Sequence, residues 1–235
     1  MSKGYFIFNG IRSSDYGVWT NGYQTYDAAA RDYEEVLVPG RDGVLTLDNG
    51  RFNQISQPYE CFIVDSYQTN IEGLRNALMA VRGTARLMDT YHPAEYYKAY
   101  YERGLNVDTL RQMHAGSFTV EFTRDPRRFL ISGETTVTKT ASGSIDNPTL
   151  FPSRPNLRVY GTGTLGVSGV VVSVNYNPGY IDIDCDMQDC YYGTTNCNSY
   201  VSFSGDDFPV LNPGTNTVTL SGITRVIITP NWYIL

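Results

Sequence analysis

The chain has 235 residues, of which 41% are hydrophobic and 18% charged, and this composition is typical of a folded protein and not of a disordered segment. Eighteen basic and 24 acidic side chains give a net charge of −6, the wrong sign for a protein that holds nucleic-acid phosphates. No apolar run approaches the ~20 residues of a membrane span, and the first residues lack a signal-peptide pattern. We therefore expect a protein made in the cytoplasm, with no stable nucleic-acid binding and no membrane insertion.

The composition changes near residue 130, which indicates two domains. Residues 1–130 hold 14 basic and 16 acidic side chains, whereas residues 131–235 hold 4 and 8. The second part is rich in Thr, Ser, Gly, Asn and Val, and it begins with the β-prone segment 134–140. We place the predicted boundary between a domain of residues 1–133 and a domain of residues 134–235.

Strands joined by tight turns, together with one helix, are predicted for the first part. Runs such as residues 5–8 and 44–47 are typical of strands, and turn dipeptides separate them. These dipeptides are Asn9-Gly10, Asn21-Gly22, Asp42-Gly43 and Asn49-Gly50.

The helix is predicted from Thr69 to Gly83. Thr69 and Glu72 match a capping box at its start, and Gly83 supplies a stop. One face carries the apolar side chains Ile71, Leu74, Leu78 and Val81. We expect this helix to cover one side of a sheet.

The second part is predicted to contain strands only, with Gly, Pro and Asn clusters between them. The expected strands are residues 157–160, 170–174, 180–184, 187–192, 200–203, 215–220 and 225–229. Their spacing predicts a small β-sandwich, so the fold class of the chain is mainly β with one helix. Alternation along these strands predicts a core of Leu157, Val159, Val172, Ile181, Ile183, Phe203, Leu211, Val218, Leu220, Val226 and Ile228.

Residues 161–166 spell G-x-G-x-x-G, which in nucleotide-binding proteins lies between a strand and a helix. Here the β-branched run 167–172 follows, so we interpret the glycines as part of a hairpin.

Asp182, Asp184 and Asp186 alternate along a predicted strand and would share one face, opposite Cys185 and Met187. They lack the Gly and Glu of a calcium-binding loop. Cys185, Cys190 and Cys197 lack zinc-ligand spacing, and we expect buried or edge thiols.

The two histidines, His92 and His114, stand near no recognisable nucleophile motif, so we expect solvated or packing roles for them. The sequence therefore predicts no catalytic residue, no metal site and no cofactor, and the protein is expected not to be an enzyme. The 19 tyrosines are interpreted as interface residues, although stacking on sugars is the alternative.

An ordered set of segments resembles the distal tail protein (Dit) family of long, non-contractile-tailed bacteriophages. The first three segments lie in the first part and the others in the second, so that the resemblance covers nearly the whole chain. The segments are residues 6–18, 38–45, 122–130, 147–149, 154–161 and 208–216.

The resemblance implies a virion structural protein at the distal end of the tail, in the baseplate or tail tip. Such proteins form a homohexameric ring, single or back-to-back, from the N-terminal domains, with galectin-like C-terminal sandwiches directed outward. The implied partners are the tail-tube protein, the tail-associated lysin or tail fibre, and other baseplate or receptor-binding proteins. DNA would pass through the ring.

Within this ring the turn Gly40, Arg41, Asp42 and Gly43 is expected to shape a structural element, because Gly43 can adopt a positive φ at little cost. The competing hypothesis for the whole chain is a carbohydrate-binding adhesin that contacts the host surface. That role needs an exposed aromatic and polar cluster on the sandwich, where the only tryptophan is Trp232.

Overall fold

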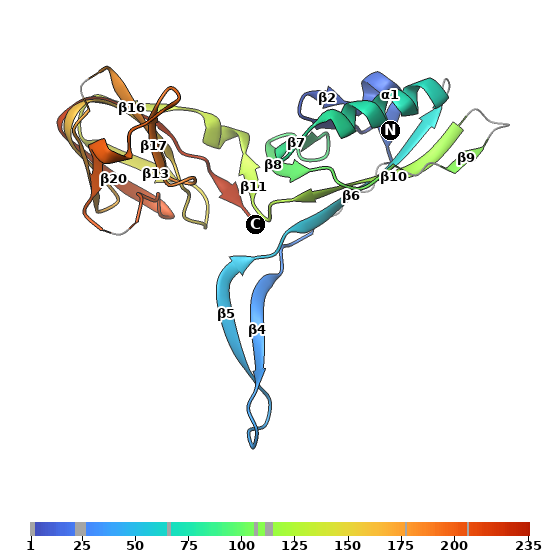
Figure 1. Cartoon of the computed structure of the whole chain (residues 1–235), viewed down its shortest axis with the longest axis horizontal. Helices are drawn as coiled ribbons and strands as arrows, with labels where there is room; N and C mark the ends of the chain where they lie inside the picture. Colours follow the sequence, from blue (N-terminus) through green and yellow to red (C-terminus); the bar gives the residue numbers. More distant parts are fainter. Residues whose placement is uncertain are drawn as a thin grey trace. The chain divides into compact units, whose positions relative to one another are not determined.

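The computed structural model describes residues 3–21, 27–64, 67–105, 108–110, 115–176, 178–205 and 207–235 (Figure 1). The chain forms two compact units, Met1–Arg128 together with Leu235, and Phe129–Ile234. Strands dominate both units, and the described residues contain one α-helix, α1 (Tyr67–Ala80), so the predicted mainly β class is confirmed. No helix in the described part of the chain is long and apolar enough to cross a membrane.

The main sheet of the first unit has the strand order β2-β1-β7-β8-β10-β6-β3, with β9 beside β10, and β4 and β5 form a separate sheet. A short 3-10 helix, η1 (Ser13–Tyr16), lies between β2 and β3. The strands are β1 (Phe6–Phe8), β2 (Ile11–Arg12), β3 (Val18–Thr20), β4 (Arg31–Leu37), β5 (Val44–Phe52), β6 (Ile55–Val64), β7 (Ala85–Asp89), β8 (Glu95–Tyr100), β9 (Asp108–Leu110) and β10 (Ala115–Arg124).

The core of the first unit forms between α1 and this sheet. Along β10 every second side chain is buried, and Phe118, Val120 and Phe122 are among them. The predicted apolar face of the helix packs in the same core, with Ile71, Leu74 and Leu78 buried and Val81 partly buried. The ring centroids of Phe8 and Phe122 are 4.9 Å apart. The helix therefore covers one side of the sheet, as expected (Figure 1).

The predicted capping box does not start the helix. The helix begins at Tyr67, which places Thr69 inside its first turn. The first N–H groups of a helix have no intrahelical partner, so polar side chains such as Gln68 and Thr69 are tolerated there as well as at the cap.

The second unit is built on the sheet order β12-β20-β14-β16-β17-β18, with β13 beside β20 and β15 between β14 and β19. It also contains two 3-10 helices, η2 (Ile131–Glu134) and η3 (Asn198–Tyr200). The strands are β11 (Arg128–Leu130), β12 (Val137–Lys139), β13 (Gly143–Asn147), β14 (Asn156–Val167), β15 (Val170–Val174), β16 (Tyr180–Asp184), β17 (Asp189–Tyr192), β18 (Thr195–Asn196), β19 (Val201–Phe203), β20 (Gly214–Thr229) and β21 (Tyr233–Ile234).

The predicted core of this unit is mostly confirmed. Nine of the eleven predicted residues are buried, whereas Phe203 and Leu220 are only partly buried and pack against the core from its border. Trp232 also belongs to this core and is 6% exposed.

The glycine-rich segment 161–166 lies inside strand β14, which forms a hairpin with β15, so the interpretation of these glycines as part of a hairpin is confirmed. The turn of that hairpin comes at Ser168 and Gly169, since Val167 pairs with Val170. Gly161 and Gly163 instead lie at a bulge where β14 and β20 change register. A Cβ atom on Gly163 would lie 2.1 Å from the carbonyl oxygen of Ser221, so only glycine fits there.

The same bulge explains why residues 215–229 form one strand where two were predicted. Gly222 adopts a positive φ of 77° and lets β20 continue past the irregularity.

All four cysteines have buried side chains and are free thiols. Burial raises the pKa of Cys61 and of Cys190 to about 12, and raises that of Cys185 further. A thiol reacts as the thiolate, so these groups are poor nucleophiles at neutral pH.

We expect almost none of the four thiols to react with an aromatic disulfide reagent in the folded protein at pH 8, so that almost no coloured aromatic thiolate is released. In denaturant, all four thiols should react within minutes, because unfolding exposes them to the reagent. Rapid reaction of one thiol in the native protein would contradict this placement.

Candidate assembly interface

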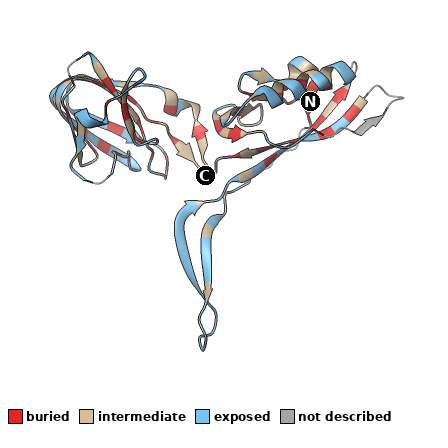
Figure 2. Ribbon diagram, viewed as in Figure 1, coloured by how far each residue is buried: buried red, intermediate tan, exposed pale blue. Residues whose placement is uncertain are grey.

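The hairpin of β4 and β5 forms a two-stranded sheet of its own, and nearly all of its residues are exposed (Figure 2). An isolated two-stranded hairpin is at best marginally stable in water, because it has no core to bury. We therefore expect the surface of another protein chain to cover this hairpin.

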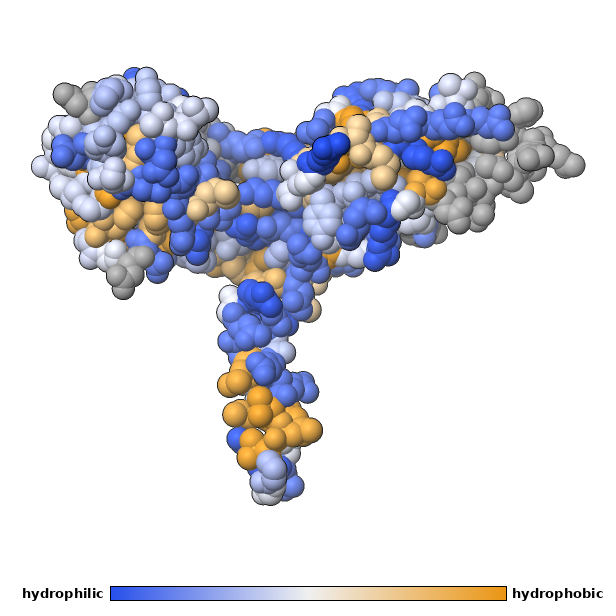
Figure 3. Space-filling view, in the orientation of Figure 1, coloured by the Kyte–Doolittle hydropathy of each residue, from blue (hydrophilic) through white to orange (hydrophobic). Residues whose placement is uncertain are grey.

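Both faces of the hairpin carry apolar side chains near its tip. Cross-strand pairing puts Leu37 opposite Val44 on one face, and Val36 opposite Leu45 on the other. Leu47 lies on the same face as Leu45. Leu37 is 79% exposed and Leu47 is 45% exposed. Figure 3 shows the resulting hydrophobic surface over the part of the hairpin toward the tip.

Exposed apolar side chains on both faces indicate an interface that encloses the hairpin. A surface strand of a monomer normally has one polar face. Clustered exposed apolar residues mark interaction sites.

Charged pairs dominate the other end of the hairpin. Arg51 Nε lies 2.5 Å from the Asp32 carboxylate, and Arg31 lies 3.4 Å from Asp48. Such exposed pairs contribute about 0–1 kcal/mol each. The exposed aliphatic side chains of the hairpin therefore lie in its tip half, whereas the aromatic Tyr33 and Phe52 lie toward its base.

The dipeptide Asn49-Gly50 lies within β5 and is not the turn that the sequence predicts. The Asp48 carboxylate accepts a hydrogen bond from the Gly50 amide at 2.8 Å, and Gly50 has a φ of 68°. The pairing shifts register beside it, between Arg31 and Tyr33. The dipeptide therefore makes a bulge, and the strand continues.

The loop at the hairpin tip contains the predicted turn Gly40, Arg41, Asp42 and Gly43. Six residues, 38–43, connect the last cross-strand pair, and the Arg41 amide donates to the Val38 carbonyl at 3.2 Å. Gly40 and Gly43 have φ values of 82° and 78°. The loop thus depends on two glycines in the left-handed region.

We expect Gly43→Val to weaken assembly more than Asp42→Asn. A Cβ atom on Gly43 would meet nothing within 4 Å, so the cost arises from the backbone alone, about 1–3 kcal/mol for a β-branched residue at positive φ. Sedimentation velocity of both variants measures this. Equal assembly of Gly43→Val and the parent protein would show that the turn does not shape the interface.

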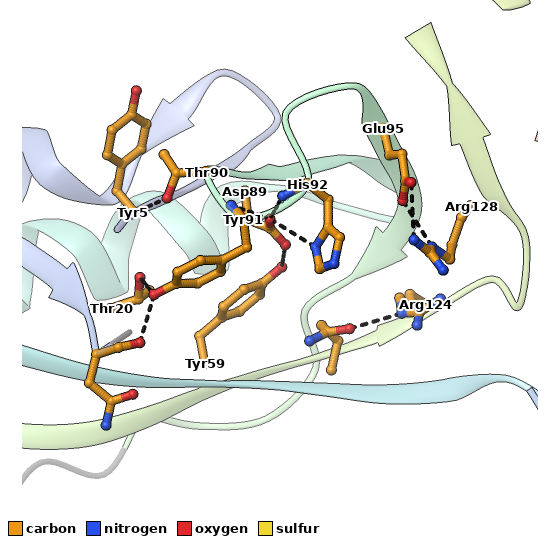
Figure 4. A network of polar contacts seen from close by, with 12 residues as sticks. Tyr5, Thr20, Tyr59, Asp89, Thr90, Tyr91, His92, Glu95, Arg124 and Arg128 are labelled. Atoms are coloured by element: carbon orange, nitrogen blue, oxygen red, sulfur yellow. Dashed lines mark hydrogen bonds and ion pairs between the residues drawn. The ribbon is translucent and has the colours of Figure 1, made fainter. Parts of the chain in front are cut away.

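A buried polar cluster joins three strands of the first unit (Figure 4). At its centre, the Asp89 carboxylate at the end of β7 accepts a hydrogen bond from the Tyr59 hydroxyl at 2.9 Å. It also accepts from the backbone amides of Tyr91 and His92 at 2.9 and 2.8 Å. Burial raises the pKa of Tyr59 well above its ordinary value, and the Asp89 charge raises it further. Tyr59 therefore stays protonated and donates.

His92 packs in this cluster, with its Nδ1 atom 3.2 Å from Asp89 Oδ1 and its side chain 12% exposed. The Tyr91 hydroxyl lies 2.5 Å from that of Thr20 and donates to the Asn21 carbonyl at 2.6 Å. A cavity of about 420 Å³ adjoins these residues. The cluster ties the end of β3 and the loop after β7 to β6, a structural role that agrees with the packing interpretation of His92. The other histidine, His114, lies outside the described residues.

The run of aspartates in the second unit is interrupted by a turn. Asp184 Oδ1 accepts from the amides of Asp186 and Met187 at 3.0 and 2.9 Å, which ends β16. Asp186 therefore does not share a strand face with Asp182, and Met187 is 76% exposed, contrary to our prediction. Among the described residues, no group of three or more His, Cys, Asp or Glu side chains is placed to hold a metal ion.

No protein-family model and no curated protein matches the sequence. The crystal structure of Dit (gp 19.1) from phage SPP1, a paradigm of the hub adsorption apparatus in phages that infect Gram-positive bacteria, matches with a TM-score of 0.74. The two chains are 14% identical, and the match covers 99% of each. The chain has a Dit-like fold. The resemblance seen in the sequence is thereby confirmed for the fold.

Two structures of the phage P2 baseplate in its activated conformation also match the chain. Their TM-scores are 0.43 and 0.47, at 12% and 11% identity. Both matches cover 97% of this chain and 98% of the other.

Proposed function

We propose that this Dit-like chain is a structural hub of a phage tail tip and not an enzyme. The observation that carries the proposal is the β4–β5 hairpin, whose exposed apolar faces need a protein partner. Its Dit-like fold supports the same role, since the SPP1 protein is a hub of an adsorption apparatus.

The proposed assembly is a homohexameric ring, single or back-to-back, formed by the first domain, residues 1–133. When one surface of a subunit contacts a different surface of the next, the contacts generate a closed ring if the rotation closes. The hairpin supplies one such surface. Strand β2 lies at one edge of the main sheet, and a neighbouring subunit can pair with such an edge.

In this proposal the ring connects the tail-tube protein to the tail-associated lysin or tail fibre and to other baseplate proteins. DNA passes through the channel. Six copies of a chain with net charge −6 disfavour capture of the passing DNA, since like charges repel. The second domain, residues 134–235, would be a galectin-like sandwich, and the protein would be located in the virion at the distal end of the tail.

Native mass spectrometry of the purified full chain, together with negative-stain electron microscopy, tests the proposal. We expect hexamers in the spectra and rings with a central opening in the images. A strictly monomeric chain at high micromolar concentration, with no rings on the virion, would overturn it.

A further inference from the structure

The outer face of the second unit's sheet collects aromatic and charged side chains. One side of the strands β20, β14, β16 and β17 faces the core, and the alternate residues face away from it. Two cross-strand rows occupy the outer face. The first row is Arg225, Tyr160 and Tyr180, and the second is Ile227, Arg158, Asp182 and Tyr191.

Five tyrosines form a contiguous series that starts on this face. The ring centroids of Tyr160 and Tyr180 are 5.7 Å apart, and those of Tyr180 and Tyr192 are 4.9 Å apart. Tyr176 follows at 5.8 Å from Tyr192, and Tyr200 at 5.2 Å from Tyr176. These residues are spread over forty positions of the sequence, and the strand register brings them together.

Polar groups stand directly beside the first two rings. Arg158 donates two hydrogen bonds to the Asp182 carboxylate, at 2.7 and 2.9 Å, while its guanidinium lies 4.3 Å from the centroid of Tyr180. Arg225 lies 3.9 Å over Tyr160. Rigid, paired groups of this kind keep donors and acceptors in fixed directions.

A hollow of about 410 Å³ opens on the same face, which is within the range of small-ligand sites. Asn156, Arg158, Asp182 and Tyr191 contribute to its lining. The hollow therefore combines an amide, a guanidinium, a carboxylate and a phenol.

This combination matches a sugar better than it matches a protein or a polyanion. A pyranose ring presents an apolar C–H face that stacks on an aromatic ring, and neighbouring hydroxyls that accept from arginine and donate to carboxylate. The Asp182 carboxylate balances the charge of Arg158, so this pair contributes little positive potential that would attract a phosphate polymer. Protein interfaces are also rich in tyrosine and arginine, and it is the hollow of about 410 Å³ beside the rings that favours a sugar unit over a protein surface.

We infer that the outer face around Tyr160, Tyr180 and the Arg158–Asp182 pair is a binding site for neutral glycans. Tyr192 and Tyr200, which are 38% and 47% exposed, extend the site for longer chains. The site adds a ligand to the second unit and does not depend on ring formation by the first.

Saturation-transfer NMR on the full-length protein tests the site. The probes are methyl glycosides of glucose, galactose, mannose, rhamnose and N-acetylglucosamine, and the β-linked di- to tetrasaccharides of glucose, galactose and N-acetylglucosamine. We expect at least one series to receive saturation, with affinity rising with chain length.

Variants assign the binding to this face. Tyr180→Ala and Arg158→Ala should each weaken binding about tenfold or more, whereas Tyr180→Phe should retain most of it, because the phenyl ring still stacks. Tyr100→Ala on β8 of the first unit is the matched control and should bind as the parent does. If Tyr180→Ala does not fold, glycan binding by Arg225→Ala tests the same face.

Absence of transfer to every glycan of the panel would overturn the inference. So would equal binding by Tyr180→Ala, Arg158→Ala and the parent protein, or binding of inorganic polyphosphate alone. Hexamer formation by all face variants is expected, so that failure of this site and failure of the hub proposal are distinguishable.

Discussion

The double variant Leu37→Asp, Leu47→Asp should fold as the parent does and fail to form hexamers. The two side chains lie on opposite faces of the hairpin, and both are exposed within the subunit, so their replacement removes no internal packing. In an assembled ring each leucine would lose contact with water, which stabilises an interface by about 1.5–3 kcal/mol per fully buried side chain. Placing carboxylates there adds a desolvation cost of several kcal/mol.

Native mass spectrometry at one protein concentration, with thermal unfolding followed by circular dichroism, measures assembly and folding separately. The control is Leu150→Asp, because Leu150 is 86% exposed and lies in the second unit. It should assemble as the parent does. Persistence of hexamers in the double variant would show that the hairpin is not the interface, while single variants reveal whether one face or both are covered.

The sequence predicts the core-facing positions of the second unit well where apolar residues alternate along a strand. Leu157 and Val159 on β14 and Ile181 and Ile183 on β16 all face the core, as their spacing requires. The errors arise where a local backbone conformation overrides alternation. Met187 continues the alternating pattern of the sequence. The Asp184 carboxylate, however, accepts a hydrogen bond from the Met187 amide in a turn, and the Met187 side chain is exposed to solvent.

Glycines explain the remaining differences in strand limits. A pair such as Asn49-Gly50 is compatible with a hairpin turn and with a bulge, since both use a positive φ. Only the pairing partner decides between them, and here β4 runs past the dipeptide. The dipeptide alone therefore does not show whether the chain turns back or continues as a strand.

The candidate interface could be found only in part from the sequence. Asp42-Gly43 indicates the hairpin tip, but alternation cannot show that neither face of the hairpin is covered by the main sheet. The tyrosine series is a similar case. Tyr160 and Tyr180 become neighbours through the β14–β16 register, and a search for tryptophan or histidine on the sandwich passes over them.

The largest loss of stability is expected for truncation of the second unit's core. Leu157 is 1% exposed and Ile183 is 0% exposed, and both belong to the same core cluster. Leu157→Ala or Ile183→Ala should each lower the free energy of unfolding by about 2–5 kcal/mol, because the cavity left behind does not fully collapse. That is a large share of the roughly 5–15 kcal/mol that stabilises a typical domain. The exposed Met187→Ala is the control and should change it by less than about 0.5 kcal/mol.

Separate fragments show where this core begins. We expect residues 134–235 to fold cooperatively and stay monomeric, and residues 129–235 to be more stable. Two observations favour the longer fragment. The Leu130 amide donates to the Trp232 carbonyl at 2.8 Å, and a Cβ atom on Gly133 would lie 2.3 Å from the Trp232 amide nitrogen, so this segment packs closely on the end of the chain.

Guanidinium unfolding and light scattering of both fragments and of residues 1–133 provide the measurements. The longer fragment should unfold at a higher denaturant concentration, with a slope that grows with the surface exposed. If residues 129–235 form hexamers while residues 1–133 remain monomeric, assembly belongs to the second unit. The hairpin would then need a partner other than a second copy of this chain, because its apolar faces stay exposed in the monomer.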